Sequence, residues 1–140
     1  MRQVSLYNSQ MENSKRKEIG RIGESAAARF IERKGFVIIE RNYRKPWGEI
    51  DIIAEKAGVV RFIEVKTLSG LPPGYNGSRE TSGYRPEEQI HQAKLRKIAR
   101  TAQSYMAQNE DSREFQIDAV GVYLDTTKRV AHCRLFEQIL

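Results

Sequence analysis

Residues 48–66, GEIDIIAEKAGVVRFIEVK, constrain the fold of this chain more than any other stretch. Two β-branched runs flank Lys56-Ala-Gly58, a pattern that is typical of two strands joined in a hairpin. Charged residues nevertheless interrupt both runs, with Asp51 in the first and Glu64 and Lys66 in the second. The stretch therefore predicts paired strands, and its charged residues need an explanation other than packing in a hydrophobic core.

Two further segments have the apolar spacing of amphipathic helices. The first runs from about Ser14 to Lys34 and meets a left-handed stop at Gly35. The second begins at Pro86, since proline suits the first turn of a helix, and runs to about Gln108. Each helix presents one apolar face that needs a partner.

Five short segments rich in β-branched residues favour strands. They are Phe36–Glu40, Glu49–Glu55, Val59–Thr67, Glu114–Leu124 and Arg129–Phe136. Two amphipathic helices and one sheet bury their apolar faces by packing on each other. We therefore predict a single α/β domain over residues 14–140, with a mixed five-stranded sheet flanked by two main helices.

Two polar segments fall outside this pattern. Residues 1–13 show no apolar period, and we expect a mobile N-terminal arm there. Residues 68–85 are rich in Gly, Ser and Pro, and so long a loop in a small domain is usually functional or disordered. We expect a long flexible loop, in which Tyr75, Arg79 and Tyr84 either stack on bases or have no role of their own.

The composition narrows the function classes. Cys133 is the only cysteine, so one chain can form neither an internal disulfide nor a cysteine-based metal cluster. No stretch approaches the ~18 consecutive apolar residues of a membrane span. The formal net charge of +6 favours a polyanionic partner such as DNA, or serves solubility alone. We expect a cytoplasmic protein with no membrane partner and no small organic cofactor.

Asp51, Glu64 and Lys66 fit a metal site if the hairpin brings them to one face. Glu64 and Lys66 share a face because side chains alternate along a strand, and they lie about 7 Å apart. Two adjacent carboxylates suit a hard divalent ion such as Mg²⁺ or Mn²⁺, and a nearby lysine can hold or deprotonate a water. Spacing alone leaves a second interpretation open, in which the charges only line the wet face of the sheet.

Glu24 lies within Gly20-Arg-Ile-Gly-Glu-Ser25, inside the first predicted helix. Two glycines in a helix cost roughly 1 kcal/mol each relative to alanine, which suggests a close approach of the backbone to a neighbour. Taken alone, Glu24 could equally be an exposed carboxylate, and the glycines could serve ordinary packing on the sheet.

In this order, the motifs resemble the YraN-like family of small bacterial proteins. The residues that carry the resemblance are GRIGESAAARFIERKGF, NYRKPWGEIDIIA, FIEVKT, KLRKIARTAQSYM and QIDAVGVYL. That family is placed in the restriction-endonuclease-like superfamily, which includes Holliday junction resolvases and has a PD...(D/E)xK signature. Asp51 and Glu64-Val65-Lys66 match the signature here.

The resemblance implies a metal-dependent DNA endonuclease, and branched or otherwise non-standard DNA is one substrate class that it suggests. It implies Asp51 and Glu64 as ligands of Mg²⁺ or Mn²⁺, and Lys66 as the residue that positions or activates water. Glu24 would be the helix-borne acid that completes the catalytic site. Glu49, which shares strand parity with Asp51, would support the ligands.

A further set of residues is implied around this centre. Asn42 and Arg44 match an NxR segment of the family, for which phosphate contact and structural pairing are both open. Lys94 matches a basic position of the helix after the loop, which also carries Lys97 and Arg100. We expect Arg44 and these three to contact DNA, although a basic helix face can also be merely solvated.

Three points stay open at this stage. A nucleic-acid-binding protein that keeps the fold without turnover is one alternative, and an adaptor with purely structural acids is another. Asp118 corresponds to the acid of an Arg-Phe-Asp motif that here reads Gln116-Ile-Asp118, with no role assigned. A homodimer is compatible with the sequence, because two symmetric sites suit the cutting of two strands.

Overall fold

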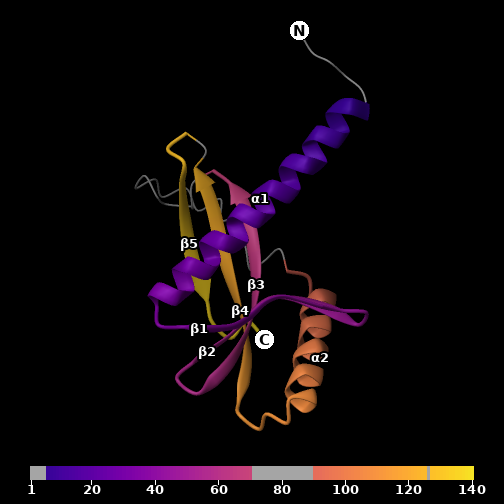
Figure 1. Ribbon diagram of the computed structural model, residues 1–140, viewed down its shortest axis with the longest axis vertical. Coiled ribbons are helices and arrows are strands. Elements are labelled where there is room, and N and C mark those ends of the chain that lie inside the picture. The colour runs from indigo at the N-terminus through magenta and orange to yellow at the C-terminus, as the bar shows by residue number, and fades with distance from the viewer. Residues whose placement is uncertain (1–5, 71–89, 126) are drawn as a thin grey trace.

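Within residues 6–70, 90–125 and 127–140, which the computed structural model describes, the chain forms one sheet and two helices (Figure 1). The elements in chain order are α1 (Leu6–Arg33), β1 (Val37–Lys45), β2 (Gly48–Lys56), β3 (Val59–Ser69), α2 (Gln92–Gln108), β4 (Phe115–Asp125) and β5 (Val130–Phe136). The predicted fold class is confirmed: an α/β domain with a mixed five-stranded sheet and two helices. No helix in this described part of the chain is both long and apolar enough to cross a membrane.

The strands lie in the order β1-β2-β3-β4-β5, and only β3 and β4 run parallel. The β2–β3 turn has the left-handed backbone that two-residue hairpins favour, with φ of 54° at Ala57 and 77° at Gly58. The parallel pair requires a crossover, and α2 lies within it. The first three strands are therefore the predicted meander, and α2 returns the chain to the sheet.

Each face of the sheet buries a separate core. Neighbouring residues of β2 alternate between them, because Ile52 packs with the α1 core and Ile53 with the α2 core. Their partners on β3 follow, with Ile63 in the first core and Phe62 in the second. The two helices thus cover opposite faces, as the matching of apolar surfaces requires.

Helix α1 begins at Leu6, eight residues before the predicted start at Ser14. Residues 6–13, expected to form a mobile arm, are therefore helical, and no Gly or Pro interrupts them. Residues 1–5 lie outside the described residues. In Figure 1 the N-terminal part of α1 projects past the end of the strands. The predicted stop is present, since Gly35 has φ of 91° and the Phe36 amide donates to the Ile31 carbonyl at 3.0 Å.

Helix α2 begins at Gln92, after His91 in extended conformation (φ −64°, ψ 149°). Its predicted start at Pro86 and most of the predicted loop, with Tyr75, Arg79 and Tyr84, lie outside the described residues. Ile90 just before the helix and Leu95 in its second turn join the same core. Their positions are those of a hydrophobic staple, which fixes the angle at which the chain enters a helix.

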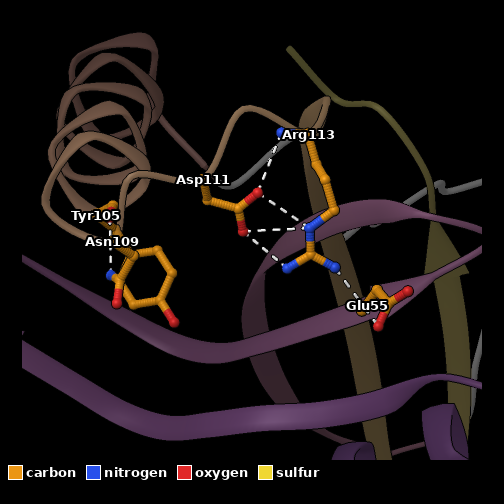
Figure 2. A network of polar contacts seen from close by, with 5 residues as sticks. All are labelled: Glu55, Tyr105, Asn109, Asp111 and Arg113. Atoms are coloured by element: carbon orange, nitrogen blue, oxygen red, sulfur yellow. Dashed lines mark hydrogen bonds and ion pairs between the residues drawn. The ribbon is translucent and has the colours of Figure 1, made fainter.

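The other end of α2 is tied to the sheet by a polar network (Figure 2). The Asn109 side chain donates to the Tyr105 carbonyl at 2.8 Å and so caps the last turn. Beyond it, the Arg113 guanidinium pairs with Asp111 at 2.7 Å and reaches Glu55 of β2 at 3.6 Å. The contact with Glu55 fixes the C-terminal end of α2 on β2, so the first turn of α2 lies a helix length away from that contact.

Helix α1 makes its closest approach to the sheet at Gly23. A Cβ atom there would lie 1.8 Å from Oγ1 and 2.8 Å from Cβ of Thr67 on β3. At Gly20 a Cβ would meet no atom within 4 Å. The expected close approach is thus found at one of the two glycines, and it seats the adjacent Glu24 against the sheet.

We predict opposite effects of alanine at these two glycines. Gly23→Ala should lower the free energy of unfolding by about 2 kcal/mol, because Thr67 must shift to admit the methyl group. Gly20→Ala should raise it by up to about 1 kcal/mol through helix propensity alone. Urea denaturation of both variants measures the difference, and equal effects would contradict the described packing of α1.

Candidate active site

The candidate site forms where β2 and β3 separate. Their pairing ends at Ile52 and Ile63, so Asp51 and Glu64 stand one step beyond the last pair. The Val65 amide would meet a backbone carbonyl in a continuing ladder, but it donates to Oδ2 of Asp51 at 2.8 Å instead. The carboxylate thus satisfies an amide that the separation would leave unpaired, and both carboxyl groups lie at the opening.

The alternation of faces along β2 breaks at Asp51. Ile50 and Ile53 both pack in the α2 core, although Ile52 between them packs in the α1 core. Across from Asp51 on β1 stands Asn42, whose φ of 53° is left-handed. Asparagine tolerates this conformation better than most residues. The position of Asn42 therefore indicates a role in shaping the strand opposite Asp51.

Glu64 is buried and Asp51 is half-buried. Burial, and next the charge of Asp51, raise the pKa of Glu64 to about 7 although Lys94 opposes the shift. Burial also raises the pKa of Asp51, against the stabilising hydrogen bond from Val65. The negative charge of each acid disfavours ionisation of the other, so a proton or a cation at the pair would relieve the repulsion.

Lys94, predicted to contact DNA, lies inside this centre. Its ammonium forms an ion pair with Oε1 of Glu64, reaching across from the first turn of α2 to β3. Burial lowers the pKa of Lys94, but its hydrogen bond to Glu64 and the charges of Glu64, Asp51 and Glu49 raise it overall. Glu49 is exposed, and its charge also raises the pKa of Asp51, so it lies near the ligand pair as strand parity suggests.

Glu24 faces the pair from α1. Burial, and next the charge of Asp51, raise the pKa of this half-buried acid, while Arg41 and Arg44 lower it. Arg44 is therefore close enough to Glu24 to act on its charge. Arg41 also donates to Oγ of Ser25 at 3.4 Å, and the sequence analysis missed this residue. Only the register of β1 on β2 reveals its position, which no local motif encodes.

A groove of about 420 Å³ lies between α1 and β3, and Glu24 is the acid that lines it. Its lining comprises Arg16, Ile19, Gly20, Glu24, Val65, Lys66 and Thr67. Lys66 thus shares the groove with Glu24, and the missing side chain at Gly20 leaves it open. Lys97 and Arg100 are exposed on α2. The structure therefore brings Asp51 and Glu64 together, places Glu24 within reach of the Asp51 charge, and puts Lys66 in the groove beside Glu24.

The carboxyl groups of Asp51 and Glu64 are the candidate ligands of the divalent ion that the motifs imply. In the described part of the chain, no three His, Cys, Asp or Glu residues gather closely enough to hold a metal ion alone. Asp51 and Glu64 supply hard carboxylate oxygens, and Mg²⁺ commonly keeps several waters beside one or two carboxylates. The two acids fit such an ion, with water or substrate filling its other positions.

Asp118 belongs to a different cluster. Its buried carboxylate pairs with Nη1 of Arg61 at 3.1 Å and accepts from Gln116 and from the Gln138 amide, each at 2.8 Å. Arg61 also lies 3.7 Å from the exposed Glu137. These contacts tie the C-terminal segment to β3 and β4. The role left open for Asp118 is therefore structural.

The sequence of the chain identifies its family. Fold and site together define an α/β protein with a mixed sheet, in which β2 and β3 separate at Asp51 and Glu64. The model described as "Uncharacterised protein family UPF0102" matches residues 23–122. The chain belongs to this family, which is the YraN family that its motifs resemble.

Relatives in distant bacteria match most of the chain. A UPF0102 protein of Campylobacter concisus is 39% identical over 104 residues, which cover 74% of this chain and 81% of that protein. One from Dictyoglomus thermophilum is 33% identical over 115 residues, covering 81% and 89%. One from Syntrophotalea carbinolica is 38% identical over 108 residues, covering 76% and 80%. Each match therefore spans most of both proteins.

We predict that Asp118→Asn lowers the free energy of unfolding by about 3 kcal/mol, because it leaves the buried Arg61 charge uncompensated. The matched variant Glu137→Gln removes only the longer, exposed pair and should cost less than about 1 kcal/mol. Urea denaturation measures both. A loss from Asp118→Asn no larger than that of Glu137→Gln would contradict the structural role.

We also predict a pH-dependent gain in stability from Glu64→Gln. The folded state raises the pKa of Glu64 from 4.5 to about 7, so it binds more protons than the unfolded state between these values. Stability from this group is therefore complete below pH 4.5 and falls as pH rises towards 7. In metal-free buffer, Glu64→Gln should raise the free energy of unfolding by about 1–2 kcal/mol at pH 8 and have little effect at pH 4.5.

The exposed Glu18 offers a control for this experiment, because Glu18→Gln should leave the pH profile unchanged. Thermal or urea unfolding across pH 4.5–8 without divalent ions provides the measurement. If Glu64→Gln were destabilising at pH 8 as well as at low pH, the described burial of the acid would be wrong.

Proposed function

We propose that this protein is a metal-dependent DNA endonuclease that hydrolyses phosphodiester bonds. The observation that carries the proposal is the meeting of Asp51 and Glu64 at the opening between β2 and β3. A sheet that only needed a wet face would leave such acids exposed and mutually distant. Glu64 is buried and Asp51 is half-buried beside it, and holding two acids together away from water costs stability unless a ligand offsets it.

The residues around the opening divide the chemistry among them. Asp51 and Glu64 would hold Mg²⁺ or Mn²⁺, and the ion would neutralise charge on the phosphate and lower the pKa of a water. Lys66, in the groove that Glu24 also lines, positions the water whose oxygen attacks phosphorus. As that bond forms, the ester bond on the far side breaks and the leaving oxygen takes up a proton from the solvent. Glu24 faces the same groove and orients the water or accepts its proton.

Basic residues offset the repulsion between these acids and a polyanion. Arg16 lines the groove, and Arg44 lies close enough to Glu24 to lower the pKa of that acid. Lys97 and Arg100 add exposed charge on α2. Together with the formal net charge of +6, they support phosphate contacts on both sides of the acids.

A cleavage assay tests the proposed activity. Labelled duplex, single-stranded, flap and four-way DNA are incubated with Mg²⁺ or Mn²⁺, the branched forms being included because of the motifs shared with Holliday junction resolvases. Asp51→Asn and Lys66→Met should each lower the cleavage rate at least about 100-fold, as expected for loss of a ligand or a water-positioning group. Lys128→Met, in the exposed β4–β5 turn, is the control that should cleave normally. Cleavage that persists unchanged in Asp51→Asn would refute the assigned site.

A DNA-binding protein without turnover is the second candidate. It is favoured by the ion pair of Lys94 with Glu64, which occupies one of the two proposed ligands. This candidate predicts binding that weakens linearly in log affinity against log salt, with no cleavage of any of the four DNA forms.

A further inference from the structure

We infer that Lys94 is a resident cation, which a divalent metal must displace from Glu64 and which then becomes available to a DNA phosphate. The inference rests on the proposed function, because it assumes that Asp51 and Glu64 bind a metal ion. It gives Lys94 a task beyond that of a surface DNA contact.

The exposure of the two partners makes such an exchange feasible. The Lys94 side chain is 56% exposed, whereas that of Glu64 is 9% exposed. The ammonium can therefore leave into water along its flexible stem, while the carboxylate cannot follow it. When Lys94 leaves, Glu64 needs another cation or a proton.

The position of Lys94 in α2 indicates that the carboxyl groups hold it there. His91 precedes the helix, so Lys94 lies in its first turn, which contains no acidic residue. The partial positive charge of a helix N-terminus disfavours a lysine at this place. The charges of Glu64, Asp51 and Glu49 act on Lys94 in the opposite, favourable direction.

Metal and lysine must compete for the same oxygens. Lys94 pairs with Oε1 of Glu64 and is attracted by Asp51, the two acids proposed to hold the ion. Two cations at one carboxylate repel each other, so each lowers the affinity of the other. Displacement frees the exposed ammonium beside β3, where a phosphate would carry the opposite charge.

Titration calorimetry with Mn²⁺ tests the competition without relying on activity. Lys94→Met should bind Mn²⁺ about tenfold more tightly than the unaltered protein, as loss of one charge-assisted hydrogen bond to the ligand predicts. Lys97→Met, one turn further along α2 and exposed, is the matched control and should bind Mn²⁺ with unchanged affinity. Equal Mn²⁺ affinities of Lys94→Met and the unaltered protein would overturn the inference and leave the proposed function standing.

If neither protein binds Mn²⁺, the metal site itself is refuted, and the inference fails with the proposed function. The transfer to phosphate has its own readout in the DNA affinity measured with Ca²⁺ and with EDTA. Lys94→Met should weaken binding several-fold in Ca²⁺ only, whereas Lys97→Met should weaken it equally in both. Equal weakening by Lys94→Met in both buffers would overturn the transfer.

Discussion

The hydrogen bond from the Val65 amide to Asp51 makes the opening in the sheet possible. Strands that separate leave backbone amides without partners, and a buried unpaired amide is costly. Asp51 supplies the missing acceptor from its side chain, at 2.8 Å, so β3 can follow β4 while β2 bends towards β1. The same carboxylate therefore stabilises the separation and furnishes half of the candidate metal site.

The two helices complete the site from opposite faces of the sheet. Helix α1 brings Glu24 close because Gly23 lets its backbone approach Thr67. Helix α2 brings Lys94, and its far end is held on β2 by the network around Arg113. The positions of Glu24 and Lys94 thus depend on packing outside the site, at Gly23 and around Arg113.

Local patterns in the sequence were sufficient for most of the fold. The β-branched runs, the Lys56-Ala-Gly58 turn and the stop at Gly35 predicted β2 to β5 and the end of α1 closely, because each depends on neighbouring residues. The first strand was predicted to end at Glu40, whereas β1 continues to Lys45. The start of α1 at Leu6 was missed, because its first residues are polar and lack the apolar periodicity from which a helix is predicted.

The site was less predictable because it depends on register and on distant pairs. Motif order pointed to Asp51 and Glu64. The break in the alternation of faces at Asp51 could be seen only in the structure, where Ile50 and Ile53 pack in one core and Ile52 packs in the other. The ion pair of Lys94 with Glu64 joins residues that lie far apart in the sequence, so no spacing rule could reveal it. Asp118 looked like a motif acid, and only its partners Arg61 and Gln138 show its structural task.

The central claim is that Asp51 and Glu64 together bind a divalent cation. Crystals grown with Mn²⁺ and measured near its absorption edge would test the claim most directly, since anomalous scattering locates the ion itself. The account predicts one strong peak within bonding distance of both carboxyl groups, with Lys94 turned away from Glu64. A fully occupied Mn²⁺ elsewhere, with the Lys94 pair intact and no peak between Asp51 and Glu64, would contradict it.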